Sequence, residues 1–196
     1  EIYTLSLHDA LPIFDVILNG LMRRYSDRVP AVNKIIQAMI KQQIIQHRDD
    51  IINDHIAFRT MGVPKLGIQS LEKIFLHYGY TREDQYQFNV KKLTAYWYKP
   101  PKESVNLPRI FISELNVNEL SPVVQKIITK YTNEVLTDPV DALNLDEGAE
   151  VDMFLHSPLW STPTLNDFNE LQSESEYASW VIYNRYYLNH FTISVH

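Results

Sequence analysis

Two short segments of the sequence begin alike, and each carries a histidine at the start of an alternating run. Residues 54–60 read Asp-His-Ile-Ala-Phe-Arg-Thr, and residues 189–195 read Asn-His-Phe-Thr-Ile-Ser-Val. Alternation of apolar and polar side chains with a period of two is typical of a half-buried β-strand. Two strands of this kind, each with a histidine on its less apolar face, predict a metal site assembled from two related modules.

The two histidines, His55 and His190, are the candidate metal ligands. A neutral imidazole is the commonest metal ligand in proteins. Two imidazoles and one carboxylate, with positions left for substrate and oxygen, form the arrangement typical of non-haem Fe(II) oxygenases. A histidine at the start of a single strand would more simply be a hydrogen-bonded structural residue, so the inference depends on the pair.

Arg59 is the candidate substrate-binding residue. Period two places His55, Ala57 and Arg59 on one face of the first strand. At about 3.3 Å per residue, the Cα atoms of His55 and Arg59 are roughly 13 Å apart. The planar guanidinium pairs with a carboxylate through two parallel hydrogen bonds, so Arg59 is suited to hold the carboxylate of a small elongated substrate. A salt bridge to a neighbouring carboxylate at the sheet edge is an equal alternative.

The carboxylate that would complete the ligand set is not evident. Glu114 lies in the predicted strand 109–115 and shares a face with Ile110 and Ile112. A carboxylate is costly to bury unpaired, so Glu114 is either a ligand or, as is commoner, a salt-bridge partner at the strand end. His156 lies in irregular chain, where active-site loops are often found, and is a weaker candidate.

The elements expected around these residues follow from apolar spacing and from Gly and Pro positions. Two helices come first, one around residues 18–25 that ends before Pro30 and one over residues 31–47. The predicted order is then strand, helix, strand, strand, strand, over residues 52–60, 71–78, 86–90, 93–98 and 109–115. Residues 136–165 are irregular by pattern, and helical spacing returns before the last strand.

This order predicts an α+β fold in which N-terminal helices precede a βαβββ module. We expect residues 14–50 to be helical, 51–116 to form the first βαβββ module, 117–188 to form a helical and irregular connection, and 189–196 to start a second, truncated module. Residues 1–13 match one reading frame of a common sequencing adapter at every position. We therefore expect residues 1–13 to be an adapter-derived scar outside the domain.

The composition is ordinary for a soluble globular protein, with 45% hydrophobic and 21% charged residues. A formal net charge of −6 disfavours a nucleic-acid partner. No apolar run approaches the roughly 20 residues of a membrane-spanning helix, so neither a nucleic acid nor a membrane is an expected partner. The sequence contains no cysteine, which excludes disulfides and thiolate ligands. A reducing cytoplasm is the expected location.

Four segments of the sequence carry a resemblance to a known family: residues 53–60, 109–115, 175–180 and 189–192. Together they resemble the 2-oxoadipate dioxygenase/decarboxylase family, also called hydroxyglutarate synthases. The resemblance implies an Fe(II) enzyme of lysine catabolism on a fold related to the vicinal oxygen chelate proteins. Such an enzyme converts 2-oxoadipate and O2 to 2-hydroxyglutarate and CO2. His55 and His190 would be metal ligands, and Arg59 would hold the substrate carboxylate.

The chain departs from the family in one respect. The family's third ligand is a glutamate that comes well after the second histidine, and here the sequence ends at His196. We therefore expect the chain to be a fragment without activity of its own. Two alternatives stay open: a vicinal-oxygen-chelate lyase or isomerase that uses a divalent metal as a Lewis acid, or a non-catalytic binding module.

Overall fold

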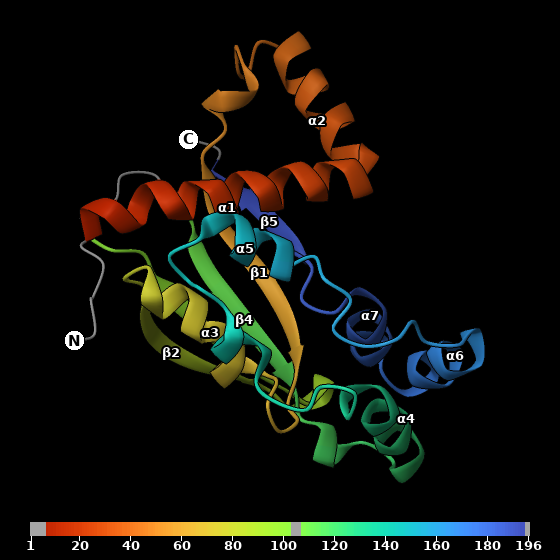
Figure 1. Ribbon diagram of the computed structural model, residues 1–196. Helices are drawn as coiled ribbons and strands as arrows, with labels where there is room; N and C mark the ends of the chain where they lie inside the picture. Colours follow the sequence, from red (N-terminus) through yellow and green to blue (C-terminus); the bar gives the residue numbers. More distant parts are fainter. Residues whose placement is uncertain (1–6, 103–106, 195–196) are drawn as a thin grey trace, which may run out of the picture.

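The fold combines helices with one five-stranded sheet, and the computed structural model describes residues 7–102 and 107–194. Helix α1 (Leu7–Arg28) lies across the sheet, and α2 (Pro30–Lys41) projects away from it (Figure 1). The turn between them falls at Val29, whose φ of −120° and ψ of 81° are not helical, because Pro30 disfavours the helical conformation for the residue before it. A short 3-10 helix, Arg48–Asp50, then leads to the first strand.

The strands and the first inserted helix follow one another in the predicted βαβββ order. They are β1 (Asn53–Met61), α3 (Ile68–His77), β2 (Thr81–Phe88), β3 (Leu93–Lys99) and β4 (Arg109–Leu115). The last described strand is β5 (His190–Ile193), and the order across the sheet is β2-β3-β4-β1-β5. β1 runs parallel to β4, and the other neighbouring pairs are antiparallel. The predicted α+β class is confirmed.

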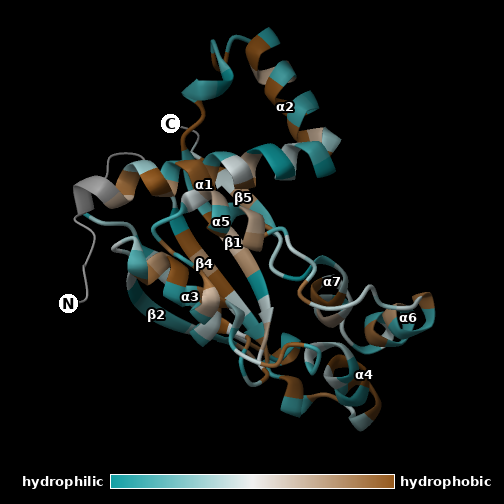
Figure 2. Ribbon diagram, viewed as in Figure 1, coloured by the Kyte–Doolittle hydropathy of each residue, from teal (hydrophilic) through white to brown (hydrophobic). Residues whose placement is uncertain are grey.

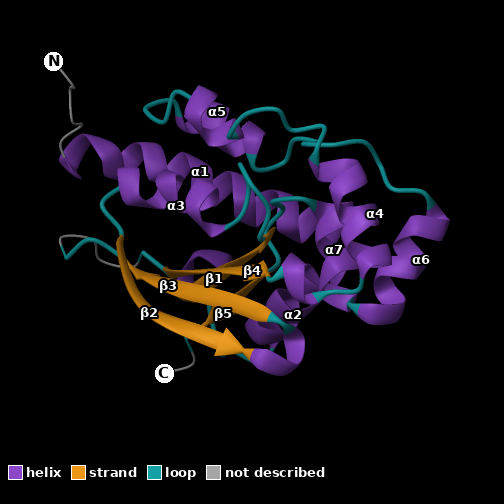
Figure 3. Cartoon of the chain, turned by 90° about the horizontal axis from the view of Figure 1, so that it is seen from below, coloured by secondary structure: helices purple, strands orange, loops and turns teal. Residues whose placement is uncertain are grey.

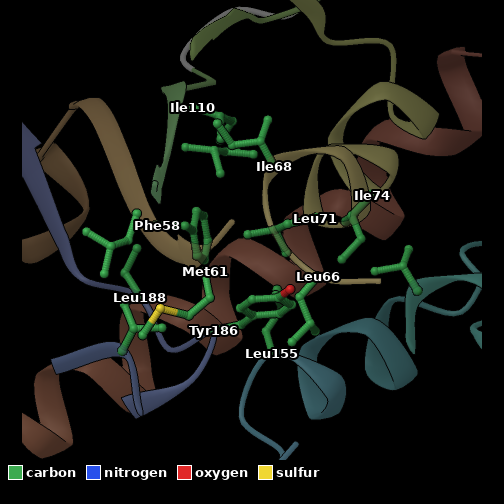
Figure 4. Close-up of a cluster of buried hydrophobic side chains, with 14 of the residues drawn as sticks. Phe58, Met61, Leu66, Ile68, Leu71, Ile74, Ile110, Leu155, Tyr186 and Leu188 are labelled. Atoms are coloured by element: carbon green, nitrogen blue, oxygen red, sulfur yellow. The ribbon is translucent and has the colours of Figure 1, made fainter. Parts of the chain in front are cut away.

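The sheet has one covered face and one open face. The curved sheet carries α1, α3 and α5 (Gly148–Phe154) on one side only (Figure 3). On the covered face, Phe58 of β1 and Ile110 of β4 pack with Leu71 of α3 in a cluster that includes Tyr186 and Leu188 (Figure 4). Full burial of one such side chain stabilises the fold by about 1.5–3 kcal/mol. The covered face therefore forms the hydrophobic core that stabilises the sheet, and the open face is available for a functional site.

Most of the remaining helices gather beyond one end of the sheet (Figure 1). They are α4 (Pro122–Thr132), α6 (Leu165–Glu174) and α7 (Glu176–Asn184). Short 3-10 helices occur at Asn89–Lys91, Val117–Glu119 and Pro139–Ala142. The first turn of α7 packs on β1, where the Tyr177 hydroxyl accepts the backbone N–H of Thr60.

Several elements differ from the sequence-based prediction, and two of the differences have a clear physical reason. α2 ends at Lys41 and not at residue 47, because Gln43 has a φ of 58° and Ile44 is 65% exposed, so that no packing extends the helix. β2 begins at Thr81 and not at residue 86. It is an edge strand whose residues are all exposed, and most of it is hydrophilic (Figure 2), so its first residues show no apolar alternation from which a strand could be predicted. The short helix α5 lies in the stretch predicted to be irregular.

The structure extends α1 back into the adapter-like segment. The helix begins at Leu7, and Ala10 and Ile13 pack against the core because the apolar spacing that leads to Phe14 and Ile17 continues through them. Their packing has no bearing on where the segment came from, so an adapter origin of residues 1–13 stays a prediction, as do the domain boundaries. Residues 1–6 and His196 lie outside the described residues.

Replacement of Phe58 by Ala should lower the free energy of unfolding by about 3–5 kcal/mol, because it leaves a cavity in the fully buried face of β1. Urea denaturation followed by circular dichroism measures this change. Leu165→Ala is the control, since Leu165 is 75% exposed, and should change the free energy by less than about 0.5 kcal/mol. Equal effects of the two substitutions would contradict the assignment of the covered face as the core.

Candidate metal centre

The two candidate histidine ligands lie on neighbouring strands. β5 pairs with β1 so that His190 is opposite Ala57 and Thr192 is opposite His55. The imidazole ring centroids are 5.6 Å apart, with an angle of 81° between the ring planes. Residues far apart in the sequence are therefore brought to one place on the open face, as the repeated motif predicts. The role of His55 and His190 as ligands stays a prediction.

The hydrogen bonds of His55 fix the orientation of its ring. Its Nδ1 lies 3.0 Å from Asp54 Oδ2 and 2.8 Å from Thr192 Oγ1. An ionised carboxylate only accepts, so in the neutral ring Nδ1 carries the proton and Nε2 offers the lone pair. A carboxylate behind a ligating imidazole is the usual outer-shell partner at metal sites. Asp54 also accepts a hydrogen bond from Arg109, at 3.4 Å.

His190 has an amide in the corresponding position. Its Nδ1 lies 2.8 Å from the Asn189 side-chain nitrogen, and an amide can turn over to offer its oxygen instead. Asn189 thus allows either tautomer of its histidine, whereas Asp54 selects one. Burial lowers the pKa of His190, and its electrostatic interactions with the neighbouring His55 and with the guanidinium of Arg59 lower the pKa further. His190 is consequently held in the neutral form that binds metals.

The other carboxylate and histidine candidates lie elsewhere. Glu114 sits on the covered face, where its Oε2 accepts the backbone N–H of Ile68 at the start of α3, at 2.9 Å. The suggestion that Glu114 is a ligand is therefore wrong, because strand alternation points it away from His55. The alternative expectation was a salt bridge at the strand end. Among the described residues, the carboxylate of Glu114 bonds to this backbone N–H and forms no salt bridge. His156 is buried against Asp152 and the end of α5.

Within residues 7–102 and 107–194, no cluster of three or more His, Asp or Glu side chains could hold a metal. The donor chemistry that is present consists of two imidazoles with their Nδ1 atoms engaged by neighbouring side chains. Imidazole suits Fe, Zn, Cu and Ni. The pair fits a divalent transition metal that takes its remaining ligands from elsewhere.

Arg59 lies further along β1 on the same face. Its Nη1 is 3.2 Å and 3.4 Å from the two carboxylate oxygens of Glu176. Its Cζ lies 5.0 Å from the ring centroid of Tyr177 and 5.1 Å from that of Trp180, within the range of cation–π attraction. The salt bridge expected as an alternative is present, although its partner belongs to α7 and not to the sheet edge.

Tyr177 anchors this arrangement to the sheet. Its hydroxyl accepts the backbone N–H of Thr60 at 3.1 Å and donates to the carbonyl of Ser113 at 2.9 Å. The Ser113 hydroxyl lies 2.8 Å from the same oxygen. Burial raises the pKa of Tyr177 above its ordinary value, so the phenol stays neutral. α7 is thereby held against β1 and β4 directly beside Arg59.

Two adjoining hollows occupy the open face, and His190 and Phe111 line both. One hollow, of about 390 Å³, extends past Arg59 and Ser113 towards Glu176. The other, of about 520 Å³, is bordered by His55 and by side chains of β2, β3 and β4. His190 thus lies where the hollows meet, His55 borders the second hollow, and Arg59 borders the first. We call this pair of hollows the groove.

Comparison with known proteins places the chain in a family. Residues 17–196 match the family model described as 2-oxoadipate dioxygenase/decarboxylase. The chain belongs to this family. It is 38% identical over 194 residues to the chloroplastic 2-oxoadipate dioxygenase/decarboxylase of Arabidopsis thaliana, covering 93% of this chain and 49% of that protein. The chloroplastic/amyloplastic protein of Oryza sativa subsp. japonica is 37% identical over 201 residues, covering 96% and 52%.

A solved structure shows the same fold. The hydroxyglutarate synthase from Oryza sativa, in complex with 2-oxoadipate, superposes with a TM-score of 0.79 at 36% identity. The match covers 94% of this chain and 58% of that chain. The present chain therefore spans about half the length of the curated relatives that it matches.

The expected cytoplasmic location is wrong, because both curated relatives are plastid proteins. The expectation was based on the absence of cysteine, which bears on redox conditions and not on which membrane encloses the protein. None of the described helices is long and apolar enough to cross a membrane.

Sequence reasoning did not identify Asp54, Thr192, Glu176 and Trp180 as members of the site. The residue before each histidine was visible as a repeated Asx, and its contact with the following ring explains the repeat. Tyr177 and Trp180 entered the sequence analysis only within residues 175–180, as part of the family resemblance and of a stretch with helical spacing. No local signal connects that helix with Arg59.

Replacement of Asp54 by Asn should weaken Co(II) binding about tenfold or more, because the carboxylate that holds the Nδ1 proton of His55 is lost. Isothermal titration calorimetry of the chain measures the affinity. Asp84→Asn is the matched control, because Asp84 borders the same hollow and bonds to Trp97. Similar losses in both variants would indicate a general charge effect and contradict the assigned role of Asp54.

Proposed function

We propose that the chain is part of a non-haem Fe(II) dioxygenase/decarboxylase that converts 2-oxoadipate and O2 to 2-hydroxyglutarate and CO2 in lysine catabolism. The observation that carries this proposal is the meeting of His55 and His190 in a groove that also contains Arg59, in a chain of this family. The complex of the Oryza sativa hydroxyglutarate synthase with 2-oxoadipate supports the choice of substrate.

We also propose that the βαβββ order, with β1 parallel to β4, is a module of the vicinal-oxygen-chelate type and that β5 begins a second module. His55 and His190 would hold the metal through their Nε2 atoms. Fe(II) held there would supply the redox chemistry with O2. The reaction balances, because CO2 and the five-carbon hydroxy acid together contain the six carbons of 2-oxoadipate and both oxygen atoms of O2.

The protein's own contribution is to bind and orient the substrate. Arg59 would take the carboxylate at the far end through a bidentate pair. The distance of roughly 13 Å between the Cα atoms of His55 and Arg59 lets the two side chains converge on a six-carbon chain. The rings of Tyr177 and Trp180 shield the guanidinium from water, which strengthens its attraction for an anion. Arg59 would therefore set the preference for chain length.

The activity is tested in a chimera in which residues 14–196 replace the matching half of the Oryza sativa enzyme. The half kept from that enzyme would supply the third ligand, a glutamate that the family resemblance places after the second histidine. We expect O2 consumption that depends on 2-oxoadipate, with 2-hydroxyglutarate as product. A folded, metal-loaded chimera without O2 consumption would favour the lyase or isomerase alternative, and one without metal would favour the binding module.

Within that chimera, Arg59→Ala should raise the KM for 2-oxoadipate by about tenfold or more, because a charge-assisted bidentate contact is lost. Its metal content should be unchanged. Arg59→Lys should restore affinity only in part, since an ammonium group cannot reproduce the planar fork. His55→Ala should instead lose the metal, measured by atomic absorption. Loss of metal from Arg59→Ala, or normal turnover by it, would contradict this division of roles.

A further inference from the structure

Arg59 already has a carboxylate partner. The guanidinium of Arg59 faces both carboxylate oxygens of Glu176, at 3.2 Å and 3.4 Å from one nitrogen. A carboxylate of the substrate would need the same guanidinium if Arg59 acts as proposed. The carboxylate of Glu176 and that of the substrate therefore compete for the guanidinium of Arg59. Which side chain moves when the ion pair opens depends on how firmly Arg59 and Glu176 are each held.

The arginine is the fixed member of this pair. Its side chain is only 23% exposed, and its guanidinium lies against the rings of Tyr177 and Trp180. Tyr177 is in turn bonded to the backbones of β1 and β4 through its hydroxyl. Arg59 thus keeps its position whether or not Glu176 is bound to it.

The glutamate is the member that can leave. Its side chain is 65% exposed, so water can replace Arg59 as its partner, and an ion pair this accessible contributes little to stability. Glu176 is also the first residue of α7, directly after the N-cap Ser175. A carboxylate in the first turn is favoured by the helix dipole in any rotamer. Release of Glu176 therefore leaves no buried charge unpaired.

We infer that Glu176 is an internal stand-in for the substrate carboxylate, which occupies Arg59 in the resting protein and is exchanged for the far carboxylate of a dicarboxylate ligand. This inference rests on the proposed function and deepens it. Only a ligand that brings a second carboxylate to Arg59 gains from the exchange. A monocarboxylate of the same length leaves the pair of Arg59 and Glu176 intact. Glu176 is thus a positioning residue for substrate specificity.

The test compares 2-oxoadipate with 2-oxohexanoate, which has the same length but lacks the second carboxylate. Binding to the chain is followed by NMR through the Trp180 indole N–H, with Zn(II) present because it has no redox chemistry. Glu176→Gln should tighten binding of 2-oxoadipate by roughly two- to fivefold, the range expected for loss of an exposed competing ion pair. Binding of 2-oxohexanoate should be unchanged, and Glu176→Asp should stay close to the parent chain.

Glu174→Gln is the matched control. Glu174 lines the same hollow and carries the same charge, but its carboxylate bonds to Ser121 and Lys92 and not to Arg59. It should not tighten binding of 2-oxoadipate. Equal tightening in both variants would overturn the inference in favour of a general field effect. Weaker or unchanged binding in Glu176→Gln would overturn it as well, and Glu176→Ala provides a second variant if the first does not fold.

Arg59→Gln separates this inference from the proposed function. If Arg59 is the clamp, this variant loses the preference for 2-oxoadipate over 2-oxohexanoate, whatever the role of Glu176. A preserved preference would contradict the proposed function. A lost preference with no tightening in Glu176→Gln would contradict only the exchange.

Discussion

The candidate site depends on one interaction, the antiparallel pairing of β5 with β1. This pairing sets His190 opposite Ala57 and so determines that the two imidazoles share a face. β5 has only four residues, and its place is secured by contacts on either side of it. The backbone N–H of Asn189 donates to the carbonyl of Ala57 at 3.0 Å, and Phe191 meets the ring of Tyr25 edge to face. Without that register the two imidazoles could not bind the same metal ion.

The two faces of β1 have separate tasks. Phe58 and its neighbours on the covered face are fully buried and supply stability, while His55 and Arg59 occupy the open face. A shift of one residue in the pairing would exchange the faces and bury the charged side chains. The parallel partner β4 opposes such a shift, because Ile110 and Ile112 need the same covered side. Stability and the placement of the candidate site are therefore secured by the same register.

Much of this arrangement could be predicted from the sequence because it is encoded locally. Alternation in residues 54–60 separates His55 and Arg59 from Phe58, and the same rule places Glu114 on the covered side with Ile110. Contacts between distant segments have no such signature. The proximity of Glu176 to Arg59 depends on how α7 meets the sheet. The end of α2 at Lys41 depends on the absence of packing around Ile44. The cellular location could not be predicted either, since cysteine content bears on redox conditions and not on the compartment.

The shortness of β5 has a consequence for how the fold and the metal depend on each other. In the part of the chain that the structure describes, β5 pairs with β1 alone, and it has four residues where the other edge strand, β2, has eight. An ion shared by His55 and His190 would act as a crosslink across a very long loop and would offset part of the entropy lost on closing it. Metal affinity and docking of the edge strand are then one linked equilibrium. Removal of the ion would loosen this edge of the sheet first and leave the core beneath it folded.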